Sequence, residues 1–257
     1  MAHLARFSPV FQHMKRMIDN GEIGIPLSCL MRGKEDLRGG GEDMMVLGTH
    51  LLDISCYLFG IPDEVSADVR FQGKTIRRGE TLPTSEPIGY CGGDQIFARF
   101  HFPCNVTGVF ESRRGMMPHM DCDRMGITVT GTKGALTVRY TDRKLKICRD
   151  FPVPIEGPST FTEIDCPALP EIPGAKPFIM QDYGLNDKIS DRYFVQNNRR
   201  AAWNLLRTIE GKESLLSSAV DARLSLEMII GTYASSIERR TLDLPLKSRQ
   251  HPLKLQK

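Results

Sequence analysis

The chain lacks the features that mark several large classes of protein. No apolar run among its 257 residues approaches the roughly 20 that cross a bilayer, and its first residues lack a signal-peptide core. The seven scattered cysteines contain no Cys-x-x-Cys pair, which excludes a zinc ribbon and a thioredoxin-like site. With 34 basic and 31 acidic residues and no long basic run, nucleic acid is not an expected partner. We therefore expect a cytoplasmic protein with reduced thiols that binds neither membranes nor nucleic acid.

The recognisable nucleotide-binding motifs are also missing. Gly39–Gly41 fails the dinucleotide fingerprint G-x-G-x-x-G because Met44 occupies the position of the third glycine. Gly73-Lys74-Thr75 looks like the end of a phosphate loop, but Asp68 stands where its first glycine must be. His119–Asp123 offers metal-capable side chains whose spacing fits no standard zinc site, so no metal is expected.

What is present is an ordinary globular composition, 40% hydrophobic and 25% charged, in a length that suits a single domain over residues 1–257. Ser8-Pro9 is a typical helix start, and Gly131–Gly134 is a typical hairpin turn. Apolar periodicity predicts helices over 9–20, 42–59, 191–210 and 218–239, and strands over 23–31, 65–71, 95–102, 106–112, 127–130, 135–140, 144–148 and 241–246.

The order of these elements indicates the fold class. Helices, then a run of short strands, then helices predict an α+β fold with a large, mostly antiparallel sheet and helices packed on one face. Residues 151–178 hold many prolines and few periodic apolar residues, which predicts an irregular excursion. If the other sheet face is apolar, it favours a homo-oligomer.

The stretch from Arg38 to Asp53 combines a glycine run with an apolar helix. Three adjacent glycines suit a place where backbone passes close to a ligand or another domain. His50 and Asp53 fall one helical turn apart, and a proton carrier beside such a loop is typical of an active-site wall. The alternative is a tight loop followed by a core helix whose histidine bonds a carbonyl.

Several stretches together resemble the C-terminal domain of the glucose–fructose oxidoreductase/inositol dehydrogenase (Gfo/Idh/MocA) family, over essentially the whole chain. They are Arg6–Pro9 with Lys15, Gly21–Pro26, Arg38–Gly41, Gly48–Asp53 (Gly-x-His-x-x-Asp), Gly131–Leu136, Ala219–Arg223 with Tyr233–Ser236, and Leu244–Leu246.

The resemblance implies a nicotinamide-dependent oxidoreductase that uses NAD or NADP and acts on a sugar, cyclitol or related polyol. It implies His50 as the proton-transfer group, with Asp53 as the second catalytic residue. Substrate contacts would come from Arg38, Gly40, Gly41 and Thr49.

Two departures from the family pattern qualify this expectation. The nucleotide-binding half and its Glu-Lys-Pro motif are absent from the sequence, so the chain would be inactive alone and would need a Rossmann-domain partner in trans. Many members carry an Asp one turn before the histidine, where this chain has Val46. Either Asp43 or Asp53 would have to take over that role, and neither has the family's spacing.

Two functions therefore remain open. The chain is the substrate-binding and oligomerisation domain of such an oxidoreductase, or a non-catalytic ligand-binding or scaffold protein derived from the family. Either would leave an apolar contact surface, which we expect on the first helix and on the His50 helix.

Overall fold

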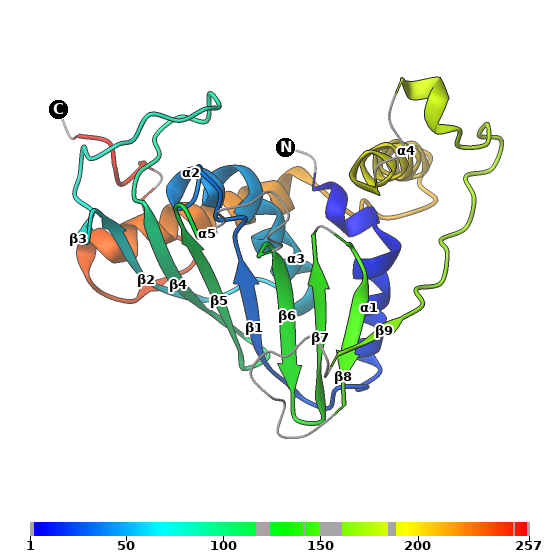
Figure 1. The fold of residues 1–257 in the computed structure, drawn as a ribbon, viewed down its shortest axis with the longest axis horizontal. Helices are drawn as coiled ribbons and strands as arrows, with labels where there is room; N and C mark the ends of the chain where they lie inside the picture. The colour runs from blue at the N-terminus through cyan, green and yellow to red at the C-terminus, as the bar shows by residue number, and fades with distance from the viewer. Residues whose placement is uncertain are drawn as a thin grey trace.

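One mixed sheet organises the part of the chain that the computed structural model describes, residues 3–116, 124–140, 142–149, 161–184, 189–248 and 250–255. The segment His119–Asp123 and residues 150–160 of the expected irregular excursion lie outside these ranges. Across the sheet the strand order is β10-β2-β4-β5-β1-β6-β7-β8-β9, with β3 paired to β2 (Figure 1). The strands are β1 (Pro26–Arg32), β2 (Glu64–Phe71), β3 (Lys74–Thr75), β4 (Gln95–Phe102), β5 (Val106–Arg113), β6 (Gly126–Gly131), β7 (Gly134–Arg139), β8 (Leu145–Cys148), β9 (Thr162–Ile164) and β10 (Leu242–Asp243).

The sheet is antiparallel except at its centre, as the sequence predicts for most of it. Strand β1 pairs with β5 in parallel, and with β6 in the antiparallel sense. This parallel pair arises because the chain leaves β1 through the helical segment α2–η2–α3 (residues 41–59). It then forms β2, β3 and β4 before it returns to the centre of the sheet as β5. Strands β3 and β9 were not expected from the sequence, and β10 is shorter than predicted.

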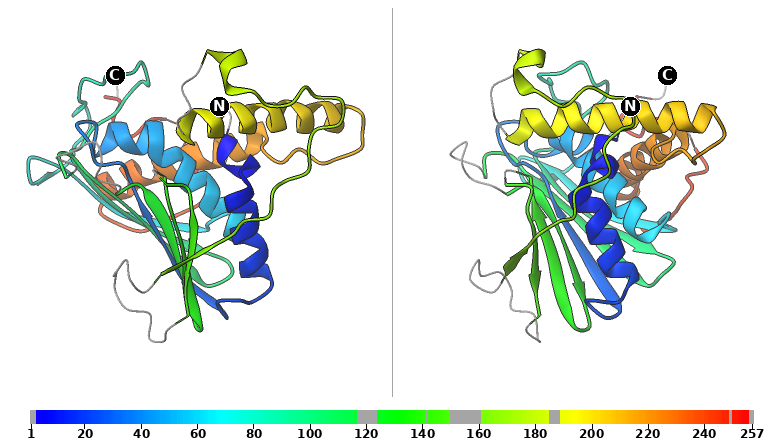
Figure 2. Two further views of the ribbon diagram at one scale, coloured as in Figure 1. Left: turned by 45° about the vertical axis from the view of Figure 1, so that its right-hand side comes forward. Right: turned by 90° about the vertical axis from the view of Figure 1, so that its right-hand side faces the viewer.

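The helices cover one face of the sheet. Helices α1 (Pro9–Asp19), α3 (Thr49–Phe59) and α5 (Ala219–Glu238) lie on the same side, and the other face is left open (Figure 2). Alternation along β4 fits this arrangement, because Ala98 and Phe100 are buried under the helices while Phe97 and Arg99 are exposed. The predicted α+β layering is therefore confirmed.

The predicted helix over 42–59 consists of three pieces. A single turn of α-helix, α2 (Gly41–Asp43), leads into a π-helical turn, η2 (Met44–Gly48), and only then into α3. At the junction a Cβ on Gly48 would lie 2.6 Å from Cζ of Phe110, so the helix can approach the sheet only with glycine there. A π-helical turn inserts an extra residue, which re-aims the side chains that follow.

Helix α4 (Ile189–Ile209) crosses one end of the sheet above the 3-10 turn η1 (Leu4–Phe7) (Figure 2). Its outer side exposes Phe194, Leu205, Leu206 and Ile209, a surface that we call the α4 stripe. We expected an apolar contact surface on the first helix and on the helix that carries His50. This expectation is wrong, because the large apolar side chains of these two helices pack into the core of the domain. Among the described residues no helix is long and apolar enough to cross a membrane.

Candidate functional site

The glycine run packs against its own chain. Gly40 has φ 93°, and a Cβ there would lie 2.4 Å from the carbonyl oxygen of Gly93. A Cβ on Gly41 would lie 2.2 Å from the Gly92 oxygen and 2.5 Å from the Tyr233 hydroxyl. The close approach that the sequence predicts is real, but the neighbour is the 92–94 loop of the same chain. The run therefore fixes where the helix that carries His50 begins.

A buried polar network ties this run to the sheet. The Gly40 N–H donates to Ser112 Oγ at 2.9 Å, and that hydroxyl donates to Asp43 at 2.6 Å. Asp43 also accepts the Glu35 N–H at 3.1 Å. Burial raises the pKa of Asp43 above its ordinary value, and the Ser112 hydrogen bond opposes that rise. Asp43 thus holds the glycine run in place. These hydrogen bonds join Asp43 to Ser112 and Glu35, and none of them is the contact with His50 that the family pattern would require.

Arg38, the predicted substrate-gripping residue, is held by two carboxylates. Its Nη2 lies 3.1 Å from Asp36, and its Nη1 lies 3.1 Å from Glu86. These ion pairs, with that to Asp36 foremost, raise the pKa of Arg38. A polar substrate at this position would have to share or displace one of them.

His50 lies half-buried in the first turn of α3. Burial lowers its pKa, and the nearby Arg143 cation lowers it further, so the ring is neutral at pH 7 and able to accept a proton. Its closest ring neighbour is His3, whose plane stands at 85° to it with the centroids 5.7 Å apart. The helix and the N-terminal segment therefore bring two imidazoles together.

Asp53 points to Arg6 instead of His50. Arg6 Nη2 lies 2.7 Å and Nε 2.9 Å from the two carboxylate oxygens of Asp53, and Arg6 Nη1 lies 3.0 Å from Asp221. Burial raises the pKa of Asp53 to about 6, while the Arg6 guanidinium works against the rise. This buried cation joins η1, α3 and the start of α5.

His3 is the functional candidate that sequence reasoning missed. Its Nε2 lies 3.0 Å from Ser225 Oγ and 3.9 Å from Asp53, and Thr49 donates to the same serine at 3.4 Å. Burial, followed by the charges of its neighbours, lowers the pKa of His3 to about 4. The signal available was its spacing of three from Arg6, which places both on one face of a 3-10 turn.

A guanidinium packed among aromatic rings lies beside this histidine pair. Arg143 has φ 51°, a conformation that L-residues rarely adopt, and its guanidinium carbon lies 3.7 Å from the Tyr193 ring centroid and 5.1 Å from that of Tyr140. Within the described residues the buried Tyr140 hydroxyl and Arg143 Nε have no hydrogen-bond partner. Arg143 is close enough to His50 to lower its pKa, so its unsatisfied Nε suits a place that binds hydroxyl groups of a ligand.

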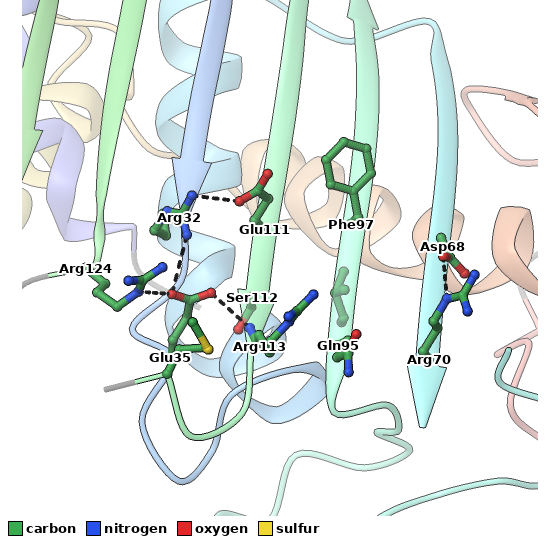
Figure 3. Close-up of a pocket in the computed structure, with 12 residues that line it drawn as sticks. Arg32, Glu35, Asp68, Arg70, Gln95, Phe97, Glu111, Ser112, Arg113 and Arg124 are labelled. Carbon is green, nitrogen blue, oxygen red and sulfur yellow. Dashed lines mark hydrogen bonds and ion pairs between the residues drawn. The ribbon is translucent and has the colours of Figure 1, made fainter. Parts of the chain in front are cut away.

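The open face of the sheet carries a separate hollow of about 390 Å³ (Figure 3). Glu35, with φ 61°, is buried at its floor, where it accepts the Arg113 N–H at 3.1 Å and pairs with Arg124. Figure 3 shows Phe97 and Glu111 pointing from the strands onto the same face. Because the helices lie on the opposite face, this hollow is distinct from the His50 region.

A dinucleotide site does not fit the residues that the structure describes. Such a site needs parallel strands whose carboxyl ends open onto a glycine loop and a helix N-terminus. The single parallel pair in the described sheet lies at its centre, and the space beside Gly40 and Gly41 is filled by the 92–94 loop. We therefore derive no step through a nicotinamide held by these residues.

Known structures share this fold. An NAD-binding oxidoreductase from Klebsiella pneumoniae aligns with a TM-score of 0.65 and 18% identity, over 96% of this chain and 66% of that one. Levoglucosan dehydrogenase in complex with NADH and levoglucosan gives 0.63 and 16%, over 95% and 66%. An oxidoreductase from Agrobacterium radiobacter in complex with NAD⁺, L-tartaric acid and magnesium gives 0.58 and 16%, over 94% and 63%. The chain thus spans about two thirds or less of these proteins.

No curated protein sequence matches the chain. The family of GFO/IDH/MocA C-terminal domains does match, over residues 11–137. That match includes most of α1, the glycine run, the His50 helix and the strands into β7, whereas His3, Arg6 and Arg143 of the candidate site lie outside it. Residues 11–137 therefore belong to the family of GFO/IDH/MocA C-terminal domains.

Proposed function

We propose that the chain is the substrate-binding and oligomerisation domain of a nicotinamide-dependent oxidoreductase that acts on a sugar, cyclitol or related polyol. The family match supports the class of enzyme, and the levoglucosan complex of a similar fold supports the class of substrate. The observation that carries the proposal is the neutral, half-buried His50 beside His3 and Arg143.

His50 is the proton-transfer residue in this proposal. Oxidation of an alcohol to a carbonyl releases one proton from the hydroxyl and one hydride from carbon. An imidazole whose pKa is lowered by burial is unprotonated at pH 7, so it accepts the hydroxyl proton. The nicotinamide that accepts the hydride, NAD or NADP, would belong to a separate Rossmann-type partner in trans, and the chain alone would be inactive.

The other site residues position this histidine and shape its surroundings. Asp53 acts through Arg6 and His3, which hold the turn facing His50. Thr49 joins the same network through Ser225. In this proposal Arg38 contacts the substrate, while Gly40 and Gly41 hold the start of the helix that carries His50 against the 92–94 loop.

Two surfaces and the thiols suggest partners and a compartment. The α4 stripe is suited to a nucleotide-binding partner, because α4 packs on η1 and so lies beside the His3–Asp53 network. The open sheet face is the surface that we propose for a homo-oligomer. The side chains of Cys29, Cys56, Cys91, Cys104 and Cys166 are free thiols, which fits the reducing cytoplasm.

A non-catalytic ligand-binding or scaffold role is the second candidate. Val46 lies in η2 and cannot accept a hydrogen bond from an imidazole. Asp43 and Asp53 are committed to Ser112 and Arg6. A histidine without a carboxylate partner still binds a hydroxyl, but it is a weaker acid–base group.

Calorimetric titration of the 257-residue chain with NADH, NADPH, levoglucosan and myo-inositol tests the proposal. We expect no heat from the dinucleotides and saturable binding of one polyol. The variant His50→Gln should bind that polyol at least about tenfold more weakly, because it loses the hydrogen bond between the imidazole and a polyol hydroxyl. His101→Gln on β4, a half-exposed histidine whose Nδ1 lies 2.7 Å from Asp63, is the matched control and should bind like the wild type.

The two functions separate when a nucleotide-binding domain of the family is added in trans. Dehydrogenase activity that requires His50 supports the enzyme. Polyol binding without activity supports the scaffold. Unchanged polyol affinity in His50→Gln would show that the substrate site lies elsewhere.

A further inference from the structure

A concave basic surface lies at the β2–β3 edge of the sheet, away from the elements that carry His50. It is a pocket of about 490 Å³ formed by the β2–β3 hairpin, the residues after β3 and the end of α5. Of the described residues that line it, five are basic and none is acidic. These five, which we call the basic pocket, are Arg70, Lys74, Arg77, Arg78 and Arg239.

Local backbone geometry brings these cations together. Gln72 and Gly73 have φ values of 50° and 78°, the two positive values of a tight turn that folds β3 back on β2. Arg239 ends α5 with φ 53°, in the left-handed conformation of a C-terminal cap. A tight hairpin and a helix end, about 165 residues apart in sequence, thus direct their cations to one hollow.

Carboxylates near this pocket bind other groups, and Asp94, whose Oδ2 accepts the Gln72 N–H at 2.9 Å, does not line it. Asp68 binds Arg70 Nε at 2.6 Å, and Glu238 binds Arg240, which lies outside the pocket. Glu80 accepts the backbone N–H of Arg77 at 2.8 Å, so this carboxylate contacts the main chain of Arg77. One cation of five is therefore neutralised by an ion pair among the described residues.

The remaining contacts compensate the charge only in part. Arg78 donates to the Pro252 carbonyl at 3.4 Å, and Arg239 sits at the negative end of the α5 dipole. For Lys74 and Arg77 no side-chain ion pair is found within the described residues. Like charges gathered in one hollow repel each other, and a bound anion removes that repulsion while it gains charge-assisted hydrogen bonds.

We propose that the basic pocket binds a phosphate group carried by a small molecule. A phosphate dianion matches several converging guanidinium and ammonium donors, and arginine recognises its oxygens in bidentate fashion. Thr75, which lines the pocket between Lys74 and Ile76, adds a hydroxyl donor. A compact hollow flanked by the open sheet face favours a small ligand over an extended polyanion, which would need a basic stripe.

Calorimetry with inorganic pyrophosphate as the probe tests this inference on the full chain. We expect saturable binding at 50 mM salt that weakens as salt is raised, and a loss of at least about tenfold in affinity for Lys74→Gln/Arg77→Gln. The matched control Lys133→Gln/Lys144→Gln removes the same charge from the exposed β6–β7 turn and the start of β8. It should bind like the wild type.

Two further titrations identify the source of the phosphate. Inorganic phosphate and glucose 6-phosphate are compared with pyrophosphate, and tighter binding of the ester supports a phosphorylated metabolite. Absence of saturable pyrophosphate binding overturns the proposal, as does an equal loss in both double variants. Tighter binding of a 20-nucleotide single-stranded DNA than of pyrophosphate also overturns it, because the surface would then recognise an extended polyanion. None of these outcomes depends on His50.

Discussion

Arg6 and Asp53, 47 residues apart in sequence, form a buried ion pair in which Nη2 and Nε of the arginine meet the two carboxylate oxygens at 2.7 and 2.9 Å. The pair joins the N-terminal turn to the helix that carries His50, and Asp221 shares the same guanidinium. It therefore holds the candidate site together from three elements.

Replacing Asp53 with Asn should destabilise the fold strongly. The change leaves the buried Arg6 cation with one remaining carboxylate, and breaking such a pair costs about 3 kcal/mol of the free energy of unfolding. Chemical denaturation measures this loss. Asp19→Asn removes the exposed pair with Lys15 and should cost less than about 0.5 kcal/mol. A stable Asp53→Asn variant that loses only polyol binding would assign Asp53 to the substrate instead.

His3 should make the protein less stable in mild acid. Its pKa falls to about 4 in the folded state, against 6.5 when exposed. The unfolded chain therefore takes up a proton below pH 6.5 while the folded chain does not, so stability is present above pH 6.5 and lost toward pH 4. The full shift corresponds to up to about 3 kcal/mol.

Comparison of denaturation curves from pH 4 to 8 isolates this contribution. Asp53, whose pKa is raised to about 6, has the opposite slope between pH 6 and 4, so only the difference between wild type and His3→Gln is informative. That difference should shrink as the pH falls. Parallel curves for wild type and His3→Gln would refute the assignment.

Gly41→Ala should destabilise the chain by about 3 kcal/mol, because its Cβ would overlap the Gly92 oxygen and the Tyr233 hydroxyl. Gly174, with φ 73°, faces open space, so Gly174→Ala should cost only about 1 kcal/mol of backbone strain. Thermal unfolding compares the two. If Gly41→Ala keeps full stability and loses polyol binding, the glycine serves the ligand.

The open sheet face should mediate self-association. Phe97 is 50% exposed there, and Phe97→Arg should shift the molar mass measured by light scattering toward the monomer. Leu205 on the α4 stripe is equally exposed, and Leu205→Arg is the matched control that should leave the oligomer intact. The reverse result would place the contact on α4, and a monomeric wild type at micromolar concentration would contradict self-association through the open sheet face.

Local patterns predicted most of the elements of this fold. Pro9 and Gly21 mark the ends of the first helix, the Gly131–Gly134 hairpin is found in its predicted place, and short runs with β-branched and aromatic residues identified β4 and β5. Those signals are local, because a turn or an amphipathic strand depends on neighbours a few residues away. The π-helical turn at Met44–Gly48 was missed, and the close approach of its Gly48 to Phe110 involves another element that no local pattern shows.

The sequence by itself determined the family, the α+β class and the candidacy of His50, because motifs and periodicity are written in consecutive residues. Only the tertiary structure decided that Asp53 faces Arg6 and that His3 lies beside His50. It also decided that the space next to the glycine run is filled by the 92–94 loop of the same chain. The physical reason is that partners of buried charges and rings are chosen by packing between distant segments. Burial then sets the pKa values of His3, His50 and Asp53, and burial is a property of the assembled fold.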